Sequence, residues 1–162
     1  MRVAVLTISD KGSKGERRDE TGRVLKEFLV AKSYEIVYYK IIPDERELIA
    51  EELIYISDKL KISLIITNGG TGFAKRDVTP EATKAVIEKE VPGIGEVMRF
   101  KSMEITPRAM LSRGIAGIRG ESLIINLPGS PKGAIENLSF VIEGIGHGLE
   151  ILLGEAVECG RT

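Results

Sequence analysis

The 162-residue chain contains no tryptophan and no glutamine, and it has one histidine and one cysteine. A single cysteine, Cys159, excludes an intrachain disulfide and a cysteine-based zinc site. The only histidine, His147, lies between two glycines in an apolar stripe, and no nucleophile elbow accompanies it. We interpret His147 as a packing or interface residue. The absence of glutamine together with abundant lysine and glutamate is typical of thermophile proteins.

A dominant charge and long apolar runs are also missing. The chain has 23 basic and 24 acidic residues and a formal net charge of −1, so it lacks the basic footprint of a nucleic-acid-binding protein. Its apolar runs are too short to span a bilayer, and the N-terminus lacks the apolar region and cleavage site of a signal peptide. We therefore expect a cytoplasmic protein that binds neither nucleic acid nor membranes.

Strands and helices alternate through the first half of the chain. The predicted strands there are apolar and end in polar loops; they cover residues 2–8, 36–42 and 62–67. Two further strands, 114–119 and 123–127, are joined at Gly120 as a hairpin, and a final helix starts near Pro131. This order predicts an α/β fold, a three-layer α/β/α sandwich with a mostly parallel sheet and a C-terminal β-hairpin. No repeat or linker divides it, so residues 1–162 are expected to form one domain.

The most informative segment is the glycine-rich stretch 68–81, which follows the third strand. Three glycines within four residues allow backbone N–H groups to approach an anion closely. Thr79 is predicted to be the N-cap of the next helix, with Pro80 as its first residue, which places a positive helix end nearby. Asp77 is a carboxylate among groups that favour anions, and Mg²⁺ shared with a phosphate would reconcile the two. The stretch matches neither a Walker A loop nor a dinucleotide fingerprint.

Three other polar loops follow predicted strands, and they carry Ser9-Asp10, Pro43-Asp44 and Pro128-Gly129-Ser130. Ligands of open α/β sheets bind beyond the carboxyl ends of parallel strands, so we expect these loops to converge with the glycine-rich stretch. Asp44 has two interpretations. With Glu47 three residues later it resembles a helix-capping box, and as a loop carboxylate it is a candidate functional group; both can hold. Asp10 and Asp19 are interpreted as a solvated loop residue and a helix cap.

Taken together, these motifs resemble the molybdopterin adenylyltransferase family (Mog/MoaB-like) of molybdenum cofactor biosynthesis. The resemblance covers almost the whole chain and includes Ser9-Asp10, Ile42-Pro43-Asp44, Gly69-Gly70-Thr71-Gly72, Arg76-Asp77-Val78-Thr79-Pro80, Leu111-Ser112-Arg113 and Leu127-Pro128-Gly129-Ser130-Pro131-Lys132. It implies a usually trimeric nucleotidyltransferase that activates molybdopterin with ATP and Mg²⁺, releases pyrophosphate, and hands its product to a molybdenum insertase.

The resemblance also implies roles for individual residues. Asp44 and Asp77 match the family's acidic positions and would act in catalysis by holding Mg²⁺. The residues expected to line the pterin or nucleotide pocket are Ser9, Asp10, Gly69, Gly70, Thr71, Gly72, Thr79, Pro128, Gly129 and Ser130. The resemblance leaves an alternative open, a non-catalytic MoaB-like protein that binds and carries molybdopterin. A competence-damage-type nucleotide hydrolase is disfavoured, because the chain keeps the Asp-Val-Thr-Pro run that ends at Pro80 and forms a single domain.

Overall fold

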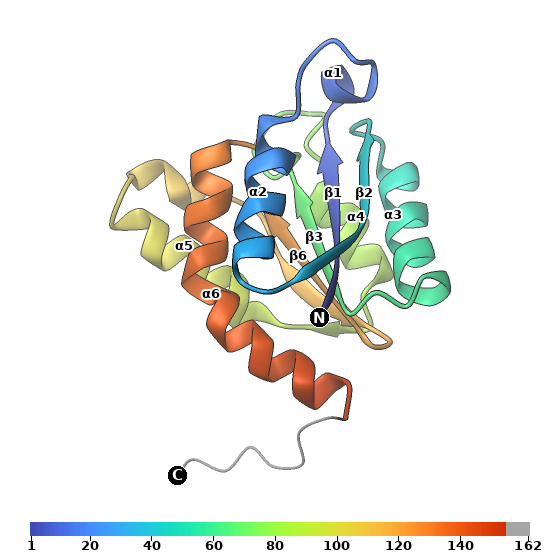
Figure 1. The fold of residues 1–162 in the computed structure, drawn as a ribbon. Coiled ribbons are helices and arrows are strands. Elements are labelled where there is room, and N and C mark those ends of the chain that lie inside the picture. The colour runs from blue at the N-terminus through green and yellow to red at the C-terminus, as the bar shows by residue number, and fades with distance from the viewer. Residues whose placement is uncertain (155–162) are drawn as a thin grey trace.

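The computed structural model describes residues 1–154, with a six-stranded sheet between two layers of helices (Figure 1). The sheet has the order β2-β1-β3-β6-β5-β4. Its strands are β1 (Arg2–Ile8), β2 (Glu35–Ile42), β3 (Leu64–Asn68), β4 (Lys89–Glu90), β5 (Ala116–Arg119) and β6 (Ser122–Leu127). The first three and β6 are mutually parallel, whereas β5 runs antiparallel to β6 and β4 antiparallel to β5. The predicted mostly parallel sheet with a hairpin near the C-terminus is confirmed.

Helices cover both faces of this sheet. The cluster on one face joins α2 (Glu20–Ala31), α5 (Pro92–Met103) and α6 (Pro131–Leu152) to the strands, and the cluster on the other joins α3 (Arg46–Ile54) and α4 (Thr79–Val86). Three short turns complete the fold, namely α1 (Asp10–Ser13), the π turn η1 (Tyr55–Lys59) and the 3₁₀ turn η2 (Pro107–Leu111). None of the helices among residues 1–154 is long and apolar enough to cross a membrane. Cys159 lies outside the described residues.

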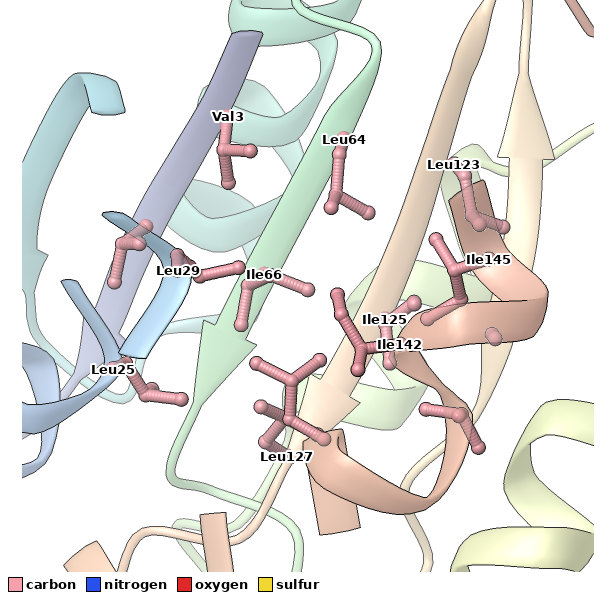
Figure 2. Packing of buried hydrophobic residues seen from close by; sticks show 14 of the residues in the cluster. Val3, Leu25, Leu29, Leu64, Ile66, Leu123, Ile125, Leu127, Ile142 and Ile145 are labelled. Carbon is pink, nitrogen blue, oxygen red and sulfur yellow. The ribbon is translucent and has the colours of Figure 1, made fainter. Parts of the chain in front are cut away.

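The core follows from the alternation of side chains along the central strands. In β1, Val3 and Val5 pack toward α2 and α6, whereas Ala4 and Leu6 pack toward α3 and α4. Figure 2 shows the first of these clusters, where α6 side chains such as Ile142 and Ile145 lie over β6. A fully buried leucine or isoleucine contributes about 1.5–3 kcal/mol. The two apolar layers therefore hold the carboxyl ends of β1, β3 and β6 in a fixed register.

Both helix caps predicted near the glycine-rich stretch are wrong. The residue that precedes α3 is Glu45, and no side chain caps that helix. Asp44 instead accepts a hydrogen bond from the backbone N–H of Asp10, 34 positions away. Helix α4 begins at Thr79 after Val78, again without a side-chain cap, because the Thr79 hydroxyl donates to the carbonyl of Gly69. In both cases a long-range partner outcompetes the local one. The structure also adds α1, inside a segment predicted as a loop.

A buried amide joins the sheet to α4. The Asn126 side chain of β6 donates to the hydroxyls of Thr67 and Thr83 at 3.0 and 2.9 Å, and it accepts from the Ile115 N–H at 3.3 Å. Asn126 is 1% exposed. Removing one partner from a buried hydrogen bond costs about 1–3 kcal/mol, because the other stays desolvated.

Asn126→Ala is therefore expected to lower the free energy of unfolding by about 2–3 kcal/mol, since three polar groups lose their partner. Urea unfolding followed by circular dichroism measures the change. Ser139→Ala is the matched control, because that exposed hydroxyl bonds only to a carbonyl one helical turn away. Equal stability of the two variants would contradict the structural role of Asn126.

Candidate functional site

A polar cleft of about 550 Å³ opens beyond the carboxyl ends of β1 and β3. These strand ends point to the top of the view in Figure 1. Four parts of the chain line this cleft. They are the end of β1 with the segment up to the start of α2, the start of the loop after β3, the residues Asp44 and Asp77, and the turn 129–131 before α6. A second hollow of about 370 Å³ between α5 and α6 is apolar, and no charged side chain of residues 1–154 lines it. Of these two hollows, the first is the one that carries the predicted site residues.

The glycine loop can adopt its conformation only with glycine at two positions. Gly69 and Gly70 have φ angles of +96° and +64°, which L side chains rarely adopt. A Cβ on Gly69 would lie 2.3 Å from the Ile8 carbonyl oxygen, and one on Gly70 would lie 2.3 Å from the Thr79 hydroxyl oxygen. The loop is thus pressed against the end of β1 on one side and the start of α4 on the other.

This packing decides which amides of the loop are available to a ligand. The N–H of Gly69 is used, because it donates to the Leu127 carbonyl at 3.1 Å. Within residues 1–154, the N–H groups of Gly70, Thr71 and Gly72 have no hydrogen-bond acceptor. Successive unpaired N–H groups in a tight turn form a concavity that binds anions. The expected phosphate-binding loop is therefore reduced by one donor.

Arg113 holds the glycine loop in place through hydrogen bonds, a role that the sequence did not predict. Its guanidinium donates to the carbonyls of Gly72 and Asp77 at 2.8 and 2.6 Å and pairs with the Glu81 carboxylate. Its backbone N–H donates to the Thr71 carbonyl at 3.0 Å. The only signal in the sequence was its place in a family motif, because the contacts span 32 to 42 positions.

Asp44 is a half-buried carboxylate in a crowded acidic corner. It and Asp10 bond reciprocally: the Asp10 N–H donates to the Asp44 carboxylate at 2.9 Å, and the Asp44 N–H donates to the Asp10 carboxylate at 3.1 Å. Burial raises the pKa of Asp44, and the carboxylates of Asp10 and Asp77 raise this pKa further. Arg76 has the opposite effect on Asp10, because two guanidinium hydrogen bonds lower the pKa of that carboxyl.

Asp77 lies on the other side of the same loop. Its Oδ2 accepts from the Ala74 N–H at 2.9 Å, and a Cβ on Gly72 would lie 2.9 Å from that oxygen. Among residues 1–154, no group of three or more histidine, cysteine, aspartate or glutamate side chains is arranged to hold a metal ion. Two carboxylates nevertheless fit Mg²⁺, which commonly takes one or two from the protein and its other ligands from water and phosphate. Burial, together with the neighbouring carboxylates of Asp10 and Asp77, raises the pKa of Asp44, and a bound cation would favour its charged form.

The structure brings most of the predicted site residues to one cleft. Those that line it are Ser9, Asp44, Gly69, Gly70, Asp77, Gly129 and Ser130. Those that adjoin it without lining it are Asp10, Thr71, Gly72, Thr79 and Pro128. Thr79 is fully buried beneath the loop, and Asp10 is engaged by Arg76. The hydroxyls of Ser9 and Ser130 accept from Gly12 and Gly133 N–H groups as the caps of α1 and α6.

The cleft lining also includes residues that sequence reasoning did not single out, among them Arg17, Arg18 and Thr21. The Thr21 hydroxyl donates to the Gly129 carbonyl at 2.7 Å and ties α2 to the turn before α6. Asp19 caps α2 as predicted, and its carboxylate also accepts from the Thr7 and Tyr39 hydroxyls. His147 is removed from this cleft, on α6 beside the Glu150 carboxylate.

The raised pKa of Asp44 predicts an unusual stability effect. A carboxyl whose folded pKa exceeds the unfolded one binds its proton more tightly in the folded state, so ionising it costs stability as the pH rises. Asp44→Asn, with EDTA present, is therefore expected to unfold at a higher urea concentration than the parent at pH 7. The difference should shrink as the pH falls toward the ordinary aspartate pKa of 3.8. A variant less stable than the parent at pH 7 would contradict this account.

Comparisons with known proteins identify the family of this chain. Residues 4–147 match the family model described as "Probable molybdopterin binding domain". The molybdopterin adenylyltransferase of Helicobacter pylori is 44% identical over 161 residues, covering 98% of this chain and 91% of that protein. The enzyme of the same name from Escherichia coli is 41% identical over 150 residues, covering 91% and 76%.

A solved structure gives the same result for the fold. The molybdopterin biosynthesis enzyme MoaB from Thermus thermophilus superimposes with a TM-score of 0.90 at 48% identity, over 94% of this chain and 96% of that chain. Since the family model spans most of the chain and these relatives align over nearly all of it, the chain belongs to the molybdopterin-binding family that includes the molybdopterin adenylyltransferases of molybdenum cofactor biosynthesis.

Proposed function

We propose that this protein is a molybdopterin adenylyltransferase that uses ATP and Mg²⁺. The observation that carries the proposal is the meeting, at one cleft, of the carboxylates Asp44 and Asp77 with a glycine loop that has unpaired N–H groups. No histidine or cysteine among residues 1–154 lines this cleft. The arrangement suits a reaction in which both the attacking group and the leaving group belong to the substrates.

In this reaction a terminal phosphate oxygen of molybdopterin attacks the α-phosphorus of ATP. The bond from that phosphorus to the bridging oxygen breaks, and pyrophosphate leaves with the electron pair. Such a transfer needs chiefly positioning and stabilisation of charge. The N–H groups of Gly70, Thr71 and Gly72 would donate to phosphate oxygens, and the N-terminus of α6, which has no acidic residue in its first turn, would face the same anion.

Asp44 and Asp77 would hold Mg²⁺, which when bound supplies a template and a Lewis acid for the phosphates. The chain fixes both carboxylates beforehand. Asp44 is held through its reciprocal bonds with Asp10, and Asp77 through the Ala74 N–H and the contact of Arg113 with its carbonyl. Since the surrounding hydrogen bonds already set these positions, little reorganisation is needed when the substrates bind.

Asp77→Asn is expected to abolish adenylyl transfer while leaving molybdopterin affinity largely unchanged. The amide keeps an oxygen for the Ala74 N–H but loses the negative charge that would hold the metal. We expect a fall in turnover of at least about 10²-fold, the magnitude for loss of one charge-stabilising group. Pyrophosphate release from ATP on addition of molybdopterin measures it.

The matched control is Asp58→Asn. This aspartate pairs with Arg119, at the end of the sheet away from the cleft, and the substitution changes the charge by the same amount. A modest loss for Asp77→Asn, comparable to the control, would show that the metal role is wrong. Molybdopterin binding by the parent protein without any pyrophosphate release would favour the carrier function instead.

The proposal extends to a cytoplasmic homotrimer that passes its product to a molybdenum insertase. Support for assembly comes from exposed apolar side chains on and around α5 and η2, namely Val97, Phe100, Met103, Ile105, Met110 and Leu111. The apolar hollow between α5 and α6 lies beside them. Exposed apolar patches of this kind mark interaction surfaces. A second copy of the chain is the occupant that we propose.

Size-exclusion chromatography with light scattering tests the assembly. The parent is expected at three times its chain mass of 17.7 kDa. Phe100→Asp, a change of a side chain that is 62% exposed, should shift the protein toward the monomer, since a buried unpaired charge destabilises an interface. Val30→Asp on α2, at a similar 60% exposure, is the control and should leave the mass unchanged. A monomeric parent protein would refute the trimer.

A further inference from the structure

Two of the charged side chains that line the cleft are the arginines Arg17 and Arg18. Arg17 and Arg18 lie on the segment between α1 and α2, line the cleft, and are exposed. Within residues 1–154 neither guanidinium forms a hydrogen bond or an ion pair. This sets them apart from Arg76, whose guanidinium is already shared between Asp10 and Glu45. Arg17 and Arg18 are therefore available to a ligand.

The segment that carries them is anchored even though the two side chains are free. On the α1 side, the N–H groups of Gly15 and Glu16 donate to carbonyls of α1, each at 3.0 Å. On the α2 side, the Asp19 carboxylate accepts from the Thr7 hydroxyl at 2.5 Å and the Tyr39 hydroxyl at 2.7 Å. The backbone of the two arginines is thus tied to α1, β1 and β2. An anchored backbone lowers the entropic cost of binding, because only side-chain freedom is lost.

The charges around the cleft explain why cations are needed there. The side chains with formal charge that line it are Arg17, Arg18, Asp19, Glu20, Asp44 and Asp77. Two positive and four negative groups leave a formal balance of −2, although both proposed substrates are anions. Among residues 1–154 the two arginines are the only cationic side chains in the lining. Without them, the lining would repel a phosphate at every charged side chain.

We propose that Arg17 and Arg18 bind a phosphate group of a substrate in this cleft, either the polyphosphate of ATP or the terminal phosphate of molybdopterin. The inference rests on the proposed adenylyl transfer and deepens it. A guanidinium matches phosphate geometry with two parallel N–H donors, which lysine cannot do. The pair thereby adds charge-assisted donors that the loop amides of Gly70 to Gly72 do not supply.

The test compares a double variant, Arg17→Ala with Arg18→Ala, with the parent protein. Isothermal titration with ATP and with inorganic pyrophosphate reports the nucleotide arm, and the KM for molybdopterin in the pyrophosphate-release assay reports the pterin arm. We expect about a tenfold or greater loss in at least one arm, the size expected for lost charged hydrogen bonds. The paired lysine substitutions should lose less, since they keep the charge.

Arg46→Ala is the control for loss of an exposed arginine outside the cleft, because Arg46 is exposed at the start of α3, has no hydrogen bond or ion pair within residues 1–154, and does not line the cleft. Unchanged melting temperatures would show that the fold is intact. Weaker binding of ATP and pyrophosphate assigns the pair to the nucleotide, and a raised KM for molybdopterin alone assigns it to the pterin. No change in either arm overturns the inference.

The outcome is separable from that of the proposed function. If the parent protein binds ATP but releases no pyrophosphate, adenylyl transfer fails as the function, while a lower ATP affinity in the double variant still supports phosphate binding by the arginines. If the parent turns over and the double variant matches it at every substrate concentration, the arginine assignment fails and the transferase stands.

Discussion

The close approach of the glycine loop to the end of β1 is the constraint on which the candidate site depends. A Cβ at Gly69 or Gly70 would lie 2.3 Å from a neighbouring oxygen, so the loop can be seated only with glycine there. Two hydrogen bonds then hold the loop: the Thr79 hydroxyl donates to the Gly69 carbonyl, and the Arg113 guanidinium donates to the Gly72 carbonyl. The carbonyls of residues 69–72 all accept hydrogen bonds, whereas the N–H groups of residues 70–72 have no acceptor within residues 1–154. The geometry of the cleft is therefore a consequence of packing at the carboxyl edge of the sheet.

The carboxylate of Asp44, beside this loop, occupies an electrostatically unfavourable position. Asp44 is half-buried near two other carboxylates, and its pKa is raised as a result. An ionised carboxylate at this position lowers the stability of the fold. The reciprocal hydrogen bonds between Asp44 and Asp10 offset only part of this loss. Such local conflicts are expected at functional sites, where the missing partner is a ligand. The acidic corner is therefore where the proposed Mg²⁺ and the phosphates of the substrates would bind.

Much of this could be read from the sequence, and the reason lies in periodicity and local chemistry. The apolar run of β3, the cap at Asp19 and the stripe of α6 are local patterns, and each is confirmed. The errors at Asp44 and Thr79 have a common cause. Both residues have good local cap chemistry, yet each bonds to a partner brought close only by the sheet, at separations of 34 and 10 positions. The roles of Arg113 and Arg17 could not be predicted for the same reason, because spacing along the chain does not indicate which residues surround them in the fold.

The charge distribution ties these observations into one picture of binding. The lining of the cleft combines the half-buried carboxylates Asp44 and Asp77 with the exposed arginines Arg17 and Arg18. Carboxylates alone would repel ATP, and arginines alone would bind a phosphate without activating it. Carboxylates and arginines in one lining would favour a ligand that has both a metal-bound phosphate and free phosphate oxygens. A polyphosphate in transfer to a second phosphate has both features, so the charges of the cleft match the proposed substrates.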